Sequence, residues 1–200
     1  MSVNQAEWEA LEQACRECHA CPLGQARCNS VFGTGDREAA LMLVGEAPGE
    51  QEDATGIPFV GKAGQLLDRY LFAADLPRES VYIANILKCR PPHNRDPQED
   101  EQESCMGYLR EQFRLVRPRV LVCLGRIAAM RLIKPDFRIT REHGNWFFKN
   151  GLWMMAVYHP SALLRDPSKR EDMLKDMLQV RLKLEELGVA PTVEEMDLHE

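Results

Sequence analysis

The sequence lacks long apolar runs and is poor in aromatic residues. Of its 200 residues 7% are aromatic, and no stretch approaches the roughly 18 apolar residues that a membrane-spanning helix needs. Residues 1–14 contain Glu7, Glu9 and Glu12 but no Lys or Arg ahead of an apolar segment, so a secretory signal is not indicated. There is no internal repeat and no low-complexity segment. These absences predict a cytoplasmic, globular protein with one domain.

An excess of basic residues is also missing. The chain has 25 Lys and Arg against 31 Asp and Glu, a net charge of −6, which argues at first against a nucleic-acid partner. However, thirteen acidic residues lie in three stretches without Lys or Arg: Glu7, Glu9, Glu12; Glu99, Asp100, Glu101, Glu103; and Glu185, Glu186, Glu194, Glu195, Asp197, Glu200. The rest of the chain carries +7. Solvated acidic surface explains these stretches, and a basic face elsewhere is compatible with them.

Seven cysteines are present, an odd number that favours metal ligands or buried thiols over disulfides in a reducing compartment. Cys15, Cys18 and Cys21 are spaced three residues apart, and Cys89 and Cys105 follow far along the chain. Four thiolates can hold an iron-sulfur cluster or a zinc ion, and the spacing leaves open which of the first three take part. Buried thiols without metal are the third alternative. Cys123 lies in an apolar strand and is expected to pack in the core.

Apolar periodicity predicts alternating helices and strands. Helices are expected at residues 5–18, 66–74, 97–116, 125–133 and 161–187, and strands at 39–44, 81–86 and 120–124, with a hairpin over 146–158. This order predicts an α/β fold, a three-layer α/β/α sandwich around a mainly parallel four-stranded sheet. The single domain would include an N-terminal helix and Cys-containing loop at 1–38 and an acidic tail at 188–200.

Polar residues gather where the predicted strands end. Four carboxylates, Glu46, Glu50, Glu52 and Asp53, follow the first strand, Asn85 ends the second, and His159 ends the last. The carboxyl ends of parallel strands share one edge, so these groups are expected to meet there. Residues 56–63 nearly match a phosphate-binding loop, but Ala63 has no hydroxyl for magnesium and Pro58 lacks an amide donor, which argues against nucleotide hydrolysis.

Several motifs together resemble the family-4 iron-sulfur uracil-DNA glycosylases. They are Gly45-Glu46-Ala47-Pro48-Gly49-Glu50 with Glu52-Asp53, Gly56-x-Pro58-Phe59-Val60-Gly61, Asn85 before Lys88-Cys89-Arg90-Pro91-Pro92, and His159-Pro160-Ser161. The resemblance spans residues 18–165. It implies an enzyme of base excision repair that flips uracil, the product of cytosine deamination, out of DNA and hydrolyses its N-glycosidic bond, leaving an abasic site.

The family pattern also implies a [4Fe-4S] cluster. Its ligands would be Cys18, Cys21, Cys89 and Cys105, leaving Cys15 and Cys28 as bystanders. The cluster would tie the N-terminal loop to the domain in a structural role.

The resemblance further implies roles for residues that bind the base. Phe59 would stack on uracil, and Asn85 would bond its N3–H and O4. Glu52 or its neighbours would line the pocket near uracil C5 and exclude the methyl group of thymine, and Ala47 would also bind the substrate. His159, neutral, would donate toward uracil O2 and stabilise the departing anion.

Ala47 stands where family-1 enzymes have an aspartate, so another group must activate water. Glu46 is our candidate for the base that activates water, with Glu52 and Asp53 behind it. A raised pKa of Glu46, or a hydrogen bond to it, would limit the repulsion between these carboxylates and DNA. A tip formed by Ser161, Leu163, Leu164 and Arg165 would bind DNA, with Leu163-Leu164-Arg165 wedged into the minor groove.

The loop at 91–97 is short, which predicts an enzyme that turns over and does not bond covalently to uracil sites. The substrate would be double- or single-stranded DNA and the enzyme a monomer. Two alternatives remain: an iron-sulfur DNA-binding module without catalysis, and a glycosylase with a broadened target such as hypoxanthine or xanthine.

Overall fold

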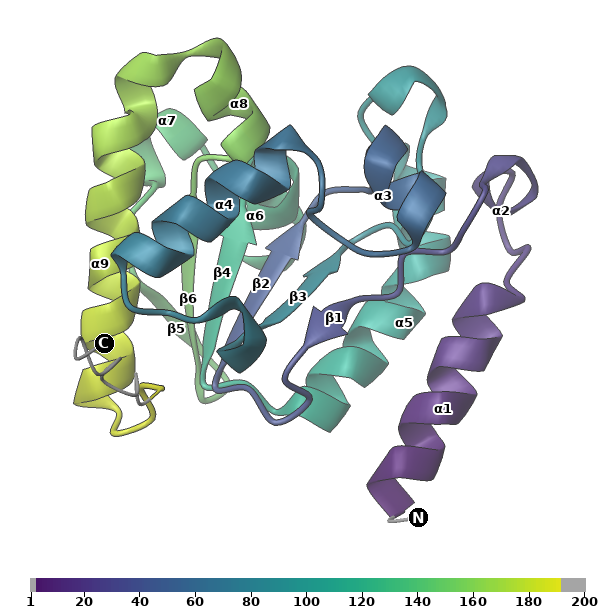
Figure 1. Ribbon diagram of the computed structural model, residues 1–200, viewed down its shortest axis with the longest axis horizontal. Coiled ribbons are helices and arrows are strands. Elements are labelled where there is room, and N and C mark those ends of the chain that lie inside the picture. Colours follow the sequence, from purple (N-terminus) through teal and green to yellow (C-terminus); the bar gives the residue numbers. More distant parts are fainter. Residues whose placement is uncertain (1–2, 192–200) are drawn as a thin grey trace, which may run out of the picture.

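The computed structural model describes residues 3–191, and its central feature is a mixed sheet with strand order β1-β3-β2-β4-β6-β5 (Figure 1). The strands are β1 (Thr34–Gly35), β2 (Leu41–Gly45), β3 (Tyr82–Asn85), β4 (Val120–Leu124), β5 (Phe147–Lys149) and β6 (Leu152–Val157). The helices are α1 (Val3–Arg16), α2 (Leu23–Ala26), α3 (Glu50–Thr55), α4 (Lys62–Ala73), α5 (Glu99–Val116), α6 (Arg126–Leu132), α7 (Ile139–Glu142), α8 (Pro160–Arg165) and α9 (Arg170–Glu186), with short 3-10 turns η1 (Arg78–Ser80), η2 (Pro92–Asn94) and η3 (Pro167–Lys169).

The α/β class is confirmed, but the expected count of four strands is wrong. Strands β3, β2, β4 and β6 are parallel, as expected, and antiparallel β1 and β5 extend the sheet at its two edges. β1 has two residues, too few for an alternating pattern. β5 is the other arm of the predicted hairpin, whose turn uses Asn150 and Gly151 at φ values of 53° and 80°.

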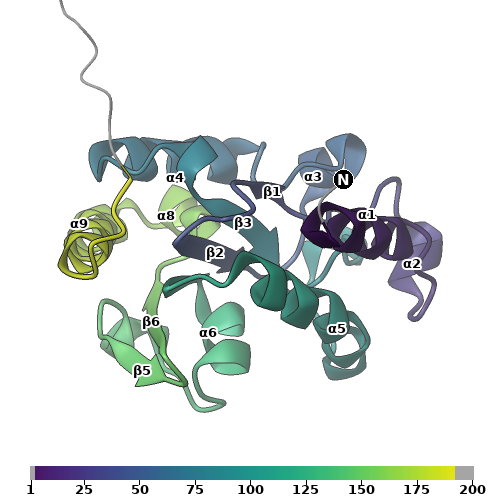
Figure 2. The ribbon, with the colours of Figure 1, turned by 90° about the horizontal axis from the view of Figure 1, so that it is seen from below.

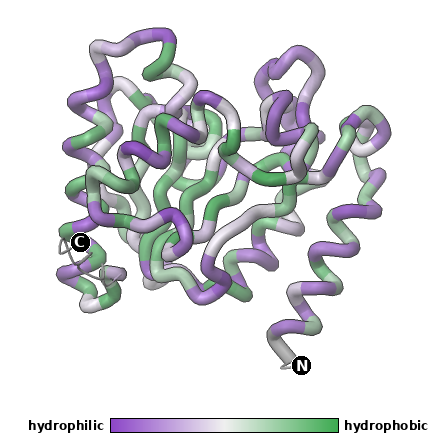
Figure 3. Tube along the Cα trace, in the orientation of Figure 1, coloured by the Kyte–Doolittle hydropathy of each residue, from purple (hydrophilic) through white to green (hydrophobic). Residues whose placement is uncertain are grey.

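Helices cover both faces of the sheet, as Figure 2 shows for α4, α8 and α9 on one side and α5 and α6 on the other. Within β2, Leu41 and Leu43 face the first group of helices, whereas Met42 and Val44 face the second. All four side chains are at most 2% exposed. Burial of both faces explains why these strands are continuously apolar instead of alternating. Figure 3 shows the hydrophobic residues gathered along the central strands.

The C-terminal helix expected over 161–187 is interrupted, so this prediction is wrong in its continuity. Helix α8 ends at Arg165, and Asp166 is extended at φ −127° and ψ 91°. A residue before proline avoids the helical region, and Pro167 follows here. The break separates short α8, which begins next to His159, from α9, which packs on α4 and β6.

Two further boundaries matter for the site. Helix α1 ends at Arg16, two residues earlier than expected, which leaves Cys18 and Cys21 in the following loop. Helix α3 lies within the segment expected as loop between β2 and α4. Within residues 3–191, no helix is long and apolar enough to cross a membrane. Of the acidic tail expected at 188–200, residues 192–200 lie outside the described part of the chain.

Candidate active site

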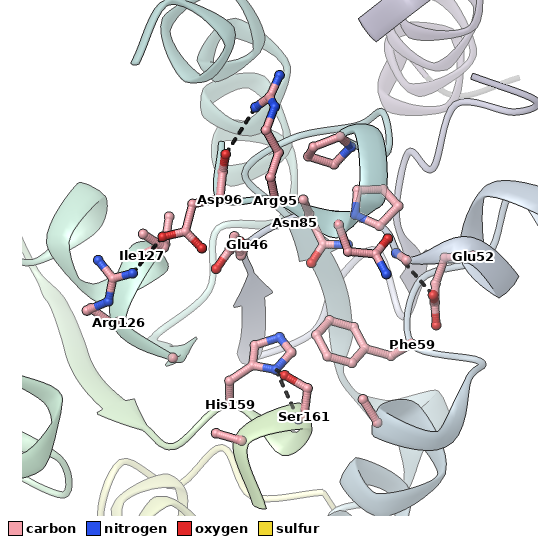
Figure 4. A pocket seen from close by; sticks show the side chains of 18 of the residues that line it. Glu46, Glu52, Phe59, Asn85, Arg95, Asp96, Arg126, Ile127, His159 and Ser161 are labelled. Atoms are coloured by element: carbon pink, nitrogen blue, oxygen red, sulfur yellow. Dashed lines mark hydrogen bonds and ion pairs between the residues drawn. The ribbon is translucent and has the colours of Figure 1, made fainter. Parts of the chain in front are cut away.

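A cavity of about 530 Å³ opens at the carboxyl edge of the parallel strands (Figure 4). Glu46 and Ala47 enter its wall directly after β2, Asn85 at the end of β3, and His159 after β6. Phe59, from the loop before α4, also lines the cavity. The structure therefore brings together residues from widely separated parts of the chain that the sequence placed at one sheet edge.

Asn85 is a buried polar group in the cavity wall. Its side chain is 1% exposed, and its Oδ1 atom is buried without a hydrogen-bond partner among the described residues. Leaving a buried amide oxygen unpaired costs roughly 1–3 kcal/mol. The neighbouring Gly45 makes room for it, because a Cβ atom on Gly45 would lie 2.4 Å from Asn85 Oδ1 and 2.6 Å from Phe59 Cζ. An amide held unpaired at this energetic cost is suited to an incoming ligand.

Phe59 and His159 place two rings side by side next to this amide. Their centroids are 5.7 Å apart and their planes are inclined by 35°. Phe59 has φ 54°, an uncommon conformation for a residue with a side chain. Its carbonyl packs so closely on α4 that a Cβ at Gly64 would come within 1.9 Å of it. The loop geometry is thus over-determined by packing, as is typical of strained residues at binding sites.

His159 is held in one neutral tautomer. The backbone N–H of Ser161 donates to Nδ1 over 3.1 Å, and the Ser161 hydroxyl lies 2.7 Å from the same atom. The ring proton is therefore on Nε2, which makes this nitrogen a donor. Burial lowers the pKa of His159 to about 4, and the charge of Arg165 acts in the same direction. At neutral pH the ring is an uncharged donor, as expected.

Glu46 combines partial burial with a charged neighbourhood. Burial raises the pKa of this carboxyl to about 7; Asp96 raises it further and Arg126 opposes the shift. Arg126 Nη2 pairs with Asp96 Oδ2 at 2.7 Å. In Figure 4 the Asp96 and Glu46 carboxylates lie close together, with Arg126 beyond Asp96. A carboxyl with a pKa near 7 can act as a general base under physiological conditions.

The other two carboxylates expected behind Glu46 have different surroundings. Glu52 lines the cavity, but its Oε1 accepts from the N–H groups of Val60 and Gly61, at 3.0 and 2.9 Å, and its Oε2 accepts from Gly49. Glu52 therefore joins the loop that ends at Gly49 to the loop that contains Val60 and Gly61.

Asp53 does not line the cavity, and the expectation that it stands behind Glu46 is wrong. Its carboxylate accepts from the backbone N–H of Cys28, at 3.0 Å, and of Asn29. A buried carboxylate needs such partners, and here the N-terminal loop supplies them.

The predicted DNA-contacting tip is only partly exposed. Leu164 is 42% exposed and Arg165 is also exposed, whereas Leu163 is 0% exposed and packs in the core with α4 and α9. The expectation that Leu163 contacts DNA is therefore wrong, because successive residues of α8 point to different faces. Ser161 lines the cavity and orients His159.

Five cysteines from three segments line a second hollow. Cys15, Cys18 and Cys21 come from α1 and the loop after it, Cys89 from the loop after β3, and Cys105 from α5. Cys28 is exposed and lies elsewhere, whereas Cys123 is fully buried in β4, as expected. The geometry thus gathers the four cysteines of the family pattern and also Cys15.

Donors already point at two of these sulfurs. Arg27 Nη1 lies 3.0 Å from Cys89 Sγ, and the Lys88 N–H lies 3.2 Å from Cys105 Sγ. Across residues 3–191, no three His, Cys, Asp or Glu side chains are close enough to hold a single metal ion. Cysteine thiolates are the usual ligands of an iron-sulfur cluster and are also ligands of zinc, so the residue types are compatible with either.

Sequence reasoning missed three charged residues of the cavity: Arg95, Asp96 and Arg126. Arg95 makes a bidentate pair with buried Glu101 of α5, at 2.9 and 2.5 Å. The available signal was the position of Arg95 and Asp96 in a short Pro-bounded loop and of Arg126 directly after the third parallel strand.

An α/β sandwich with these groups at the carboxyl ends of its parallel strands defines the class of protein. The family model described as the uracil DNA glycosylase superfamily matches residues 32–182, so the chain belongs to that superfamily. It is 43% identical to the type-4 uracil-DNA glycosylase of Archaeoglobus fulgidus over 183 residues, 86% of this chain and 92% of the relative. It is 39% identical to the type-4 enzyme of Thermotoga maritima over 90% of this chain and 96% of the relative.

A type-5 uracil-DNA glycosylase of Pyrobaculum aerophilum is also similar, with 36% identity over 64% of each chain. The longer coverage of the type-4 relatives confirms the resemblance stated from the motifs.

Proposed function

We propose that the cavity binds a uracil flipped out of DNA and that the chain hydrolyses its N-glycosidic bond, leaving free uracil and an abasic site. This is the activity that the similar type-4 enzymes are named for. The observation that carries the proposal is the buried, unpartnered Oδ1 of Asn85 beside the rings of Phe59 and His159.

Asn85 would recognise the base edge. Its oxygen accepts from uracil N3–H and its amide nitrogen donates to O4, whereas cytosine exchanges the donor and the acceptor at these positions. A site built to hydrogen-bond one pattern rejects the exchanged pattern strongly, because buried polar groups are then left unpaired. Phe59 would stack on the ring. We assign exclusion of the thymine methyl group to Ala47 and the loops that Glu52 clamps.

Hydrolysis separates charge between the base and the sugar. His159 would donate from Nε2 to uracil O2 and stabilise the anion that leaves when the bond from C1′ to N1 breaks. Glu46, deprotonated, would accept a proton from the water that adds to C1′ and would favour the positively charged sugar. Released uracil takes up a proton from solvent, so the reaction balances as hydrolysis.

We further propose a [4Fe-4S] cluster held by Cys18, Cys21, Cys89 and Cys105. When bound, it would supply a cross-link between the N-terminal loop, the loop after β3 and α5. The convergence of these cysteines and the donors on Cys89 and Cys105 support this assignment. Four iron and four acid-labile sulfide per chain would support it; a single zinc per chain would exclude it.

Contacts to DNA are proposed for Leu164 and Arg165, which are exposed, and for Ser161 at the cavity mouth. We also propose that one chain acts as a single-domain monomer in the cytoplasm, on double- or single-stranded DNA.

The test is base release from matched oligonucleotides. Oligonucleotides containing U:G, U:A, T:G, hypoxanthine or single-stranded U are incubated with the protein, and abasic sites are then cleaved with alkali. We expect cleavage at uracil and none at thymine, and loss of cleavage in Asn85→Leu. Cleavage at hypoxanthine would favour the broadened enzyme, and DNA binding without cleavage would favour the non-catalytic module.

A further inference from the structure

Lys88 is a buried lysine that lies between the two sites. It is 1% exposed, and its side chain reaches back to the end of β3. Its Nζ donates to the backbone carbonyl of Asn85 over 2.9 Å and to Gln112 Oε1 over 2.7 Å. Burying an ammonium group is costly unless its hydrogen bonds and its charge are compensated. Its position therefore requires an explanation.

The main chain of Lys88 belongs to the cysteine site. Its N–H donates to Cys105 Sγ over 3.2 Å, its carbonyl accepts from Val31 over 2.7 Å, and Cys89 follows directly. Lys88 also lines the cysteine hollow. A single residue thus contacts the proposed cluster ligands through its backbone and the proposed base-reading residue through its side chain.

The negative charge that could compensate Lys88 lies on the cysteine side. Both partners of Nζ are neutral carbonyl oxygens, and among residues 3–191 Lys88 forms no ion pair with a carboxylate. Burial disfavours the charged form of Lys88, and the sulfurs of Cys105, Cys15 and Cys89 oppose that effect. Of these, Cys105 and Cys89 would be thiolates when they hold the proposed cluster. Opposite charges close together in a buried region stabilise each other more than they do in water.

The far end of the network anchors Gln112. Its Nε2 donates to the Phe32 carbonyl over 2.8 Å and to the Tyr82 hydroxyl over 3.0 Å. Gln112 is thus held on the side away from Lys88, and its Oε1 and the Asn85 carbonyl at the end of β3 are the two acceptors of the ammonium group.

We propose that Lys88 is a positioning residue that connects the cysteine site to Asn85 and fixes the Asn85 backbone so that its amide faces the flipped base. This inference rests on the proposed function. It assigns to the cysteine site a second role, support of base recognition, beyond joining the loops.

The experiment compares iron-replete Lys88→Met with wild type and with Tyr82→Phe. The control removes one of the two acceptors of Gln112 Nε2 and leaves the bonds of Gln112 to the Phe32 carbonyl and to Lys88 in place. We expect the single-turnover rate of uracil release from Lys88→Met to fall at least tenfold. Affinity for DNA that contains an abasic site should stay within twofold, because phosphate contacts dominate it. Tyr82→Phe should stay within twofold in both measurements.

A second readout does not depend on activity. Removing a positive charge beside the cysteine site should make the reduction potential of Lys88→Met more negative than that of wild type, and leave that of Tyr82→Phe unchanged. If Lys88→Met cannot be obtained folded, Gln112→Leu removes one acceptor of the same ammonium group, and we expect its rate to fall about threefold.

Failure of the inference is distinct from failure of the proposed function. A wild type that releases no uracil would overturn the function. An active wild type with an equally active, iron-replete Lys88→Met of unchanged potential, or with Gln112→Leu no slower than Tyr82→Phe, would overturn the role of Lys88.

Discussion

The raised pKa of Glu46 leads to a pH dependence of base release. If deprotonated Glu46 is the base that activates water, the rate follows the fraction of Glu46 that is ionised. That fraction grows as pH rises through the pKa of about 7. His159, with a pKa of about 4, remains neutral over this range and adds no second transition.

The size of the effect follows from the pKa. With a pKa of about 7, roughly 3% of Glu46 is ionised at pH 5.5 and nearly all at pH 8.5, so the rate should rise roughly 30-fold between them. Burial is the largest cause of the shift and Asp96 the second. Asp96→Asn should therefore move the midpoint of the profile to lower pH without returning it to the ordinary value near 4.5.

Single-turnover release of uracil from a single-stranded oligonucleotide, measured from pH 5.5 to 8.5, provides the assay. Glu46→Gln should be slower at every pH, by roughly 10²- to 10⁴-fold at pH 8.5, and its profile should be flat. Glu185→Gln, a neutralised carboxylate at the far end of α9, serves as the matched control and should keep the wild-type midpoint. A flat wild-type profile that coincides with that of Glu46→Gln would refute the assignment.

Three further predictions concern residues around the cavity. Gly45→Ala would place a Cβ 2.4 Å from Asn85 Oδ1 and so displace the Asn85 amide. The single-turnover rate should fall roughly 100-fold, because displacing a substrate-binding group by about 1 Å costs that much. An unaffected rate would contradict the close packing of Gly45 against Asn85. His159→Ala should slow the release of uracil by roughly 10²- to 10³-fold, and it should slow the release of 5-fluorouracil less, because the anion of that base is more stable. Equal loss of rate for the two bases in kinetic assays would argue against stabilisation of the anion by His159. Leu164→Ala should reduce release from double-stranded more than single-stranded DNA, whereas Leu163→Ala should lower stability by roughly 2–5 kcal/mol in thermal unfolding; the reverse pattern would make Leu163 the wedge.

Predictions for the central elements succeeded where the signal is local and repeated. The strand at 120–124 matches β4 residue for residue, and those expected at 39–44 and 81–86 differ from β2 and β3 only at their ends. Burial on both faces produces continuous apolar runs that are readable without neighbours. The break after Arg165 could also have been predicted, because Pro167 disfavours a helical conformation at Asp166.

Predictions failed where the outcome depended on which face a side chain takes. Leu163 and Leu164 are chemically identical neighbours, yet one is 0% and the other 42% exposed, because α8 packs one side against α4. Asp53 and Glu52 are adjacent carboxylates, but only Glu52 lines the cavity. Adjacent helical residues point about 100° apart, which sequence alone does not orient relative to the core.

The sequence by itself determined the α/β class and the edge of the sheet where Glu46, Asn85 and His159 meet. These follow from hydrophobic periodicity and from the rule that parallel strands end at one edge. Only the tertiary structure decided that Glu46 has a pKa of about 7, that Asn85 Oδ1 has no hydrogen-bond partner among residues 3–191, and that Lys88 bonds both the Asn85 carbonyl and Cys105 Sγ. Desolvation and close approach depend on groups from distant parts of the chain, and these become neighbours only after folding.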